Sequence, residues 1–121
     1  MKSLAQLRQE QMRRAMLDVL NDAGAPLNAL TVRTVMDGLN HSTTWQTFLN
    51  CIGYLAGEGL LCVFPITCST GELTIFDQEK YLDLMHQANY DSPEARQMML
   101  RLRQDGRRFL EGNQAGVKGV A

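Results

Sequence analysis

The pattern of hydrophobic positions begins with an amphipathic helix. Over residues 4–22, apolar side chains recur every three or four positions, which is the period of one helix face. Ser3, followed three residues later by Gln6, has the spacing of a capping box at the start of this helix. The expected buried stripe consists of Leu4, Leu7, Met12, Ala15, Met16, Val19 and Leu20.

A break and a shorter helix follow. Gly24 and Pro26 interrupt the first pattern, and Asn28 is placed to cap a second helix over residues 29–38. The core candidates of this second helix are Leu30, Val35 and Met36.

Residues 42–61 predict a third helix that leads directly into a strand. We expect Ser42 as its N-cap and Gly59 at its stop, where the chain favours positive φ. Residues 60–66 are nearly all apolar, and Pro65 marks this strand as an edge or an end, because proline has no amide hydrogen to donate. The expected buried stripe of the third helix consists of Trp45, Phe48, Leu49, Ile52, Leu55 and Ala56.

A hairpin is expected next. Thr70-Gly71 is a turn signal, and after it Leu73 and Ile75 alternate with their neighbours as they would in a strand. Paired with the strand at residues 60–66, this segment would complete a two-stranded wing.

Two further helices are predicted toward the C-terminus. Asp77 can cap the first, over residues 78–88. The order Ser92-Pro93-Glu94 is that of a cap, a first-turn proline and an early acid, and it starts the second. The apolar set of the first of these helices is Tyr81, Leu82, Leu84 and Met85.

The last helix is expected to run from Pro93 to Glu111. Residues 98–102 also alternate as a strand would, with Asp105-Gly106 as a following turn, but the helical period holds over more residues and is favoured. From residue 112 onward, the glycine-rich sequence is expected to be a frayed tail.

Size and composition place the chain among ordinary soluble proteins. It has 121 residues, of which 45% are hydrophobic and 21% are charged. No apolar run approaches the roughly 20 residues that span a bilayer, and the polar N-terminus is unlike a signal peptide, so a cytoplasmic protein without membrane contact is expected. The expected division is a main domain over residues 1–76, a helical extension over 77–112 and a flexible tail over 113–121.

Candidate chemistry for metal binding or catalysis is sparse. Cys51, Cys62 and Cys68 have no zinc-site spacing, and only His41 and His86 could add ligands. The sequence contains no nucleophile elbow, P-loop or dinucleotide fingerprint. We therefore expect no cofactor, no metal and no enzymatic activity.

Charge is distributed unevenly along the chain, although the net charge is only −1. Residues 1–36 carry five basic and three acidic side chains. Residues 37–95 carry one basic and eight acidic side chains, whereas residues 96–121 carry six basic and two acidic ones. An acidic middle segment is therefore followed by a basic C-terminal segment, which concerns partners more than fold.

Three stretches of the chain resemble a known family. They are RRAMLDVLNDAG at 13–24, LNHSTTWQTFLNCIGYLAGEGLL at 39–61 and LRQDGRRFLEG at 102–112. In these stretches the chain resembles the small winged-helix proteins encoded among the late genes of Mu-like phages and prophages. The family's closing sequence usually follows the last strand of the wing. The resemblance implies a phage-encoded accessory protein that is regulatory or linked to DNA packaging.

The chain departs from that family in two places. The family tends to carry an arginine in its reading helix where this chain has Leu49. It also passes more directly from the wing to the closing helix, whereas residues 77–97 intervene here.

The outward face of the third helix is the first candidate DNA surface. Glutamine and asparagine can bond adenine in two places, and threonine can contact a thymine methyl group. Yet this helix and its wing hold no lysine or arginine to neutralise phosphates, while Glu58 and Glu72 are present. A face that contacts protein, with Tyr54 as its anchor, is the alternative. The candidate DNA-contacting residues here are Ser42, Thr43, Thr44, Gln46, Thr47 and Asn50.

The C-terminal arginines are the second candidate DNA surface: Arg101, Arg103, Arg107 and Arg108. They could bind phosphates or an acidic partner, pair with the acidic middle segment, or simply be solvated. Because a three-helix unit cannot bury the apolar faces of residues 78–88 and 93–110 as well, a homodimer built on those faces is also expected.

The sequence therefore predicts a mainly α (α+β) fold, namely a winged helix-turn-helix with a two-stranded wing and extra C-terminal helices. The expected function is non-enzymatic DNA binding or regulation. The alternative is an adaptor between proteins that has kept the scaffold and lost its DNA surface.

Overall fold

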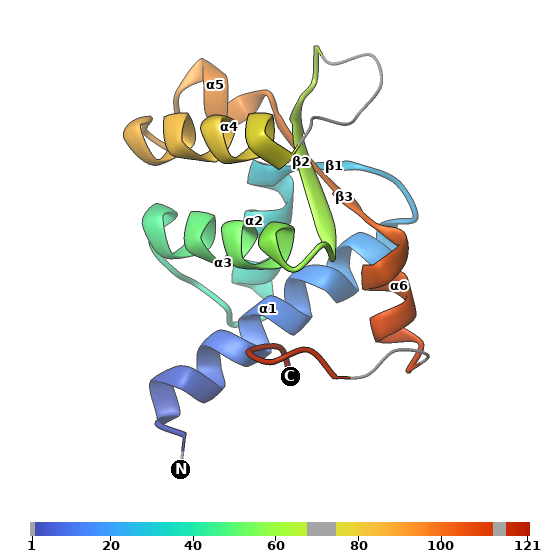
Figure 1. Cartoon of the computed structure of the whole chain (residues 1–121). Coiled ribbons are helices and arrows are strands. Elements are labelled where there is room, and N and C mark those ends of the chain that lie inside the picture. Colours follow the sequence, from blue (N-terminus) through green and yellow to red (C-terminus); the bar gives the residue numbers. More distant parts are fainter. Residues whose placement is uncertain (1, 68–74, 113–115) are drawn as a thin grey trace.

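A computed structural model describes residues 2–67, 75–112 and 116–121. Within them the chain is mainly helical, with a small antiparallel sheet of three strands (Figure 1). The elements, in chain order, are α1 (Leu4–Ala23), β1 (Leu27–Asn28), α2 (Ala29–Gly38), α3 (Trp45–Gly57), β2 (Leu61–Pro65), α4 (Ile75–Gln87), α5 (Pro93–Arg96), β3 (Met98–Leu102) and α6 (Gln104–Leu110). None of the helices in these ranges is long and apolar enough to cross a membrane.

The three strands lie in the order β1-β3-β2, so that β3 occupies the centre. It pairs antiparallel with both neighbours, with Leu27 opposite Leu100 on one side and Leu61 opposite Leu102 on the other. β2 is an edge strand of this sheet, which confirms the prediction made from Pro65.

The observed sheet of three strands corrects the prediction of a two-stranded wing. β2 pairs with β3, about 35 residues further along the chain, and Ile75 already belongs to α4 rather than to a return strand. Asp77 consequently lies inside α4 and is not its cap. The expected turn at Thr70-Gly71 and Leu73 fall outside the described residues.

The expected helix over residues 93–111 is also wrong. The start at Ser92 is confirmed, but α5 ends after four residues and the chain continues as β3. Met98 and Leu100 alternate into the core, and both edges of β3 find a hydrogen-bonding partner, so pairing on two sides outweighs the helical period. Asp105-Gly106 is not a turn but lies within α6.

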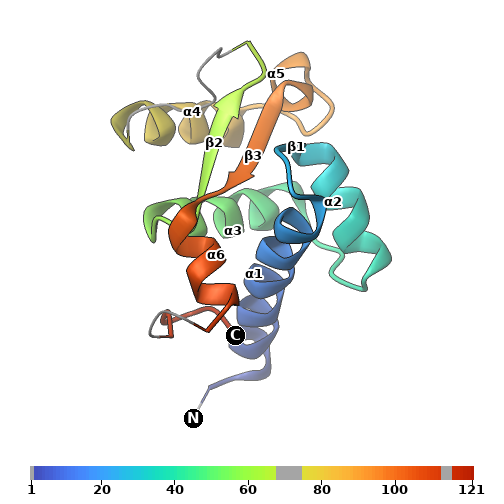
Figure 2. The same cartoon turned by 90° about the vertical axis from the view of Figure 1, so that its right-hand side faces the viewer.

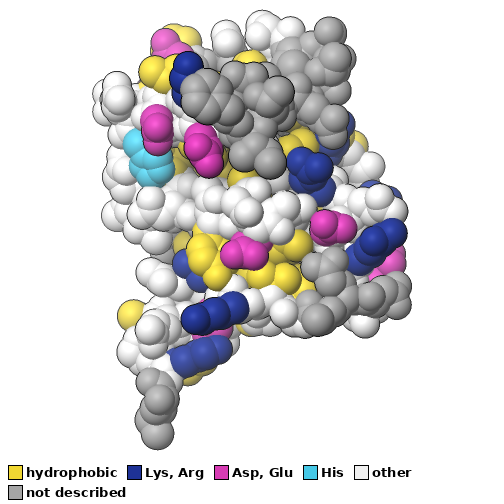
Figure 3. All heavy atoms as spheres, in the orientation of Figure 1, with side chains coloured by type: hydrophobic (Ala, Val, Ile, Leu, Met, Phe, Trp, Pro, Cys, Tyr) yellow, Lys and Arg dark blue, Asp and Glu magenta, His cyan; other side chains and the backbone are white. Residues whose placement is uncertain are grey.

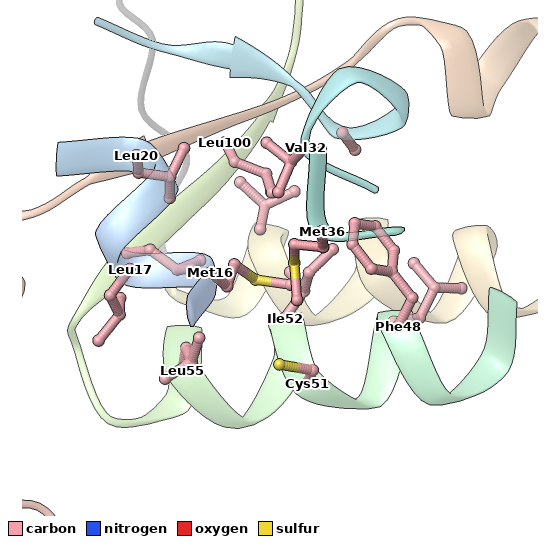
Figure 4. Packing of buried hydrophobic residues seen from close by; sticks show 14 of the residues in the cluster. Met16, Leu17, Leu20, Val32, Met36, Phe48, Cys51, Ile52, Leu55 and Leu100 are labelled. Atoms are coloured by element: carbon pink, nitrogen blue, oxygen red, sulfur yellow. The ribbon is translucent and has the colours of Figure 1, made fainter. Parts of the chain in front are cut away.

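One core joins α1, α2 and α3 to the inner face of the sheet. Figure 4 shows Met16, Met36 and Ile52 pointing toward one another where these helices meet. The apolar stripe predicted for α3 is buried except for the half-buried Ala56. Other core predictions fail because those side chains lie at ends or outer faces of helices: the exposed residues are Leu4, Leu7, Val35 and Leu84.

Helix ends follow local sequence closely. The capping box of Ser3 and Gln6 is present, and the Asn28 side chain accepts from Leu30 N at 2.8 Å. Gly59 has a φ of 75°, as expected of a glycine at a helix stop. The predicted N-cap of α3 is shifted, since Thr44 and not Ser42 caps it.

The C-terminal segments are part of the same fold. Leu82, Met85 and Phe109 are buried against the core of their own chain, so these side chains need no second copy to cover them, and the homodimer stays a prediction. The expectation of a frayed tail is wrong for residues 116–121, because Val120 is only 8% exposed and joins the core. Burial of Val120 contributes about 1.5–3 kcal/mol to holding this segment against the core.

Candidate nucleic-acid interface

The start of α3 is fixed by contacts on both sides of the helix. Trp45 is 8% exposed, stacks on Phe48 at 5.8 Å between ring centroids, and donates from its indole N–H to Ala88 O at 3.2 Å. Thr44 accepts from Thr47 N at 3.1 Å, which satisfies one of the free amides of the first turn. The residues that precede and open α3 are thus held in one orientation.

α4 packs beside α3 and engages one of the candidate reading residues. Gln46 donates from Nε2 to His86 O at 2.9 Å, and its Oε1 lies 2.6 Å from His86 Nδ1. Both ends of the Gln46 amide therefore have partners from α4. A base contact by Gln46 would require this pair of hydrogen bonds to break.

The residues of α3 that face outward from the fold lie on one line. Thr47, Asn50 and Tyr54 follow the spacing i, i+3, i+7, opposite the buried stripe. Figure 3 shows that the band of surface over α3 is largely uncharged. The chemistry of this face is therefore hydrogen bonding and not charge attraction.

The turn between α2 and α3 presents Ser42 and Thr43 at the surface. The Ser42 hydroxyl bonds the carboxylate of Asp37. Thr43 O accepts from Arg33 Nη2 at 2.8 Å, so a guanidinium is held directly beside this turn. Arg33 also lies over the ring of Tyr90, 5.0 Å from its centroid, which further restricts its orientation.

Two surface hollows flank the Ser42–Thr43 turn. One, of about 530 Å³, is lined by Arg33 and Tyr90. The other, of about 630 Å³, is lined by the exposed Arg8 of α1 together with Thr47. Two arginines from other helices therefore stand beside the candidate reading residues.

Arg8 and Arg33 were not predicted to lie beside the outward face of α3, because they belong to the two preceding helices and α3 with its wing has no basic residue of its own. One signal was present. Arg8 stands four positions before Met12, and Arg33 three positions before Met36, so each precedes a core residue on the same side of its helix. Only the packing of α1 and α2 against α3 shows that these faces converge.

The four C-terminal arginines lie near one another but at the other end of α3. Arg101, Arg103 and Arg107 line one hollow of about 520 Å³, and Arg107 and Arg108 line another of about 320 Å³. Asp105 and Glu111 share these hollows and reduce their positive charge.

The two candidate surfaces are separated by the length of α3. Arg103 N donates at 3.0 Å to the carbonyl of Leu60, three residues beyond the end of α3. α6 therefore begins at the C-terminal end of α3, as Figure 2 also shows. At 1.5 Å per residue the 13 residues of α3 span roughly 20 Å.

Arg96, the first residue of the basic C-terminal segment, pairs with Asp91 of the acidic middle segment. Its guanidinium bonds the Asp91 carboxylate at 2.5 Å, which raises the pKa of Arg96. Both side chains are largely exposed, so solvent screens this pair. Arg103, Arg107 and Arg108 are exposed on α6.

The described residues contain no cluster of three or more His, Cys, Asp or Glu that could hold a metal ion. Cys51 is buried, and burial raises the pKa of its thiol to about 12, which keeps it protonated and unreactive at neutral pH. Cys62 is buried as well, while Cys68 falls outside the described residues.

Comparison of the chain with models of protein families, with curated proteins and with solved structures finds no match.

Proposed function

We propose that this chain is a winged-helix protein that binds double-stranded DNA with the outward face of α3. The order of elements supports this, because two helices joined by a short turn precede an antiparallel pair of strands, with α3 in the place of a reading helix. α4 and α5 would then be an insertion between the two strands of the wing. The resemblance to winged-helix proteins of Mu-like phages agrees with this arrangement.

The observation that carries the proposal is the position of Arg8 and Arg33. DNA affinity depends on cations that neutralise phosphates, and α3 itself has none. The hollows on either side of the Ser42–Thr43 turn each bring one guanidinium to the start of α3. In the proposed complex these two arginines bind the backbone, while α3 enters the major groove between them.

Base reading is assigned to the uncharged residues of α3. Asn50 can bond adenine in two places, and Thr47 can contact a thymine methyl group. Both lie on the outward face, and Asn50 is exposed. Arg107 and Arg108, roughly 20 Å away along α3, would contact phosphates outside the site that α3 reads.

The test is binding of a fluorescent 20-base-pair duplex, measured by anisotropy over a series of salt concentrations. Arg8→Ala should weaken binding and reduce the slope of log K against log salt by about 0.9, the value for one phosphate contact. Arg96→Ala removes the same charge from α5 and is the matched control, for which no change is expected. Changing Arg101, Arg103, Arg107 and Arg108 together to Ala tests the second surface separately.

An adaptor that binds another protein is the second candidate function. The bonds from Gln46 to His86 and the uncharged band over α3 favour it, because a neutral face suits a protein partner better than a phosphate backbone. Absence of duplex binding at low salt, with a folded protein, would reject the DNA proposal and leave the adaptor.

A further inference from the structure

Residues 116–121, here called the strap, run back along α1. Figures 1 and 2 both place the C-terminus beside α1. Val120 is buried in the core, and Val117 packs against the same cluster. A hollow of about 340 Å³ remains where the strap meets Gln6 and Gln9 of α1, so the strap is held by a few contacts and does not fill its groove.

Side chains of α1 and α3 hold the backbone of the strap. Arg13 Nη1 donates to Gly119 O at 2.8 Å, and the Tyr54 hydroxyl donates to Lys118 O. The Arg13 guanidinium also lies 3.8 Å from the centroid of the Tyr54 ring. The strap is therefore bound by a stacked pair of one arginine and one tyrosine.

The end of the strap makes two more bonds to α1. The amide of Ala121 donates to Glu10 O at 3.2 Å, and Arg14 Nη1 donates to Ala121 O at 3.3 Å. Two arginines of α1 are thus occupied with carbonyl groups of the strap.

Gly119 is the residue on which this docking depends. Its φ is +84°, which L side chains rarely adopt. A Cβ at this position would collide with the Tyr54 hydroxyl and lie 2.9 Å from Arg13 Nη1. Any other residue is strained here by the positive φ, and its Cβ would push the Tyr54 hydroxyl and the Arg13 guanidinium away from the strap.

The strap covers part of the face that we assign to DNA. Tyr54 lies one helical turn beyond Asn50 on the outward face of α3, and the strap sits on its hydroxyl. A duplex whose major groove held the full length of α3 would collide with Lys118 and Gly119 of the docked strap. The same docking withdraws Arg13 and Arg14 from phosphates.

We infer that the strap and double-stranded DNA compete for the outward face of α3, so that docking of the strap restrains DNA binding. This inference rests on the proposed function. Release of the strap frees Tyr54 of α3 and the guanidinium groups of Arg13 and Arg14. If the strap is docked nine-tenths of the time, its release raises the apparent affinity roughly tenfold, because only the undocked fraction binds.

Two glycines of the strap provide a matched pair of variants in the full-length chain. Gly119→Ala adds one methyl group that collides with Tyr54, and it should release the strap. Gly116→Ala adds the same methyl group where nothing lies within 4 Å and φ is not positive, and it should leave the strap docked. Neither substitution changes the charge, so salt-dependent attraction to DNA is the same in both. Val120→Asp is a second releasing variant, because it places a charge in the core site of Val120.

Release is measured as the rate of tryptic cleavage after Lys118, followed by intact mass, and DNA binding by anisotropy of the same 20-base-pair duplex. We expect Gly119→Ala and Val120→Asp to be cleaved faster and to bind DNA more tightly. Gly116→Ala should match the unaltered protein in both assays.

Faster cleavage with unchanged DNA affinity would overturn the competition while leaving DNA binding intact. Unchanged protection of Lys118 in both releasing variants would also overturn it, because residues 116–121 would then not be a separable strap. If neither the unaltered protein nor any variant binds DNA at low salt, the proposed function fails, and the competition fails with it.

Discussion

At Gly106, the structure and helix propensity make opposite predictions for the stability of an alanine variant. It lies in α6 and is buried, and replacing a helical glycine with alanine ordinarily stabilises a protein by about 1 kcal/mol. A Cβ at Gly106 would instead collide with the backbone carbonyl of Leu60 and lie 2.7 Å from Leu102 Cδ1. Gly106→Ala is therefore expected to destabilise the protein.

The size of the expected loss of stability depends on which atoms the added Cβ would displace. The Leu60 carbonyl cannot shift freely, since it accepts from Arg103 N at 3.0 Å and joins the end of α3 to β2. Overpacking a fixed site costs about 1–3 kcal/mol. Weakening the hydrogen bond to Arg103 adds about 1 kcal/mol. Set against the gain of about 1 kcal/mol in helix propensity, the expected net loss is about 1–3 kcal/mol of unfolding free energy.

The assay is urea unfolding followed by circular dichroism, with a thermal melt beside it. A loss of this size should lower Tm by about 4–12 °C in a chain of this length. Gly53→Ala is the matched control, because Gly53 lies within α3 and the nearest atom to an added Cβ is Leu82 Cδ1 at 4.0 Å. It should stabilise the protein by about 1 kcal/mol. A Gly106→Ala protein as stable as the unaltered one, with Gly53→Ala stabilised, would refute the packing of α6 against Leu60.

Two further predictions concern the core. Trp45→Phe should lower the unfolding free energy by about 1 kcal/mol, because phenylalanine keeps the apolar contact but loses the indole hydrogen bond to Ala88 O. Trp45→Ala should lower it by about 3–5 kcal/mol, because the buried ring is lost as well. Equal losses for the two variants in urea titrations would mean that the indole hydrogen bond, and not burial, dominates. Cys51 should resist iodoacetamide in the native protein at pH 8.5 and react in urea, as mapped by peptide mass, because burial raises the pKa of its thiol from 9.0 to about 12. The folded state then holds this proton more tightly than the unfolded state, so stability should fall as the pH rises from about 9 toward 12, and rapid native labelling of Cys51 would contradict its burial.

Features that depend on near neighbours were predictable from the sequence. The caps at Ser3 and Asn28 and the stop at Gly59 each depend on residues within a few positions. The apolar stripe of α3 follows from helical spacing alone, and the edge position of β2 follows from Pro65. The mainly helical α+β class rests on these local signals.

The central strand β3, the candidate interface and the strap were decided only by tertiary contacts. The pattern of residues 98–102 fits a helix or a strand, and the longer helical period favoured the helix. They form β3 because β1 and β2 offer hydrogen bonds on both sides. In the same way, Gln46 bonds a histidine 40 positions away, and Arg13 bonds a carbonyl 106 positions away. Arg8 and Arg33 reach the start of α3 only because α1 and α2 pack against it. A local pattern shows which face of a helix or strand is apolar, but it does not show which distant element will cover that face. The candidate interface and the strap both depend on that packing.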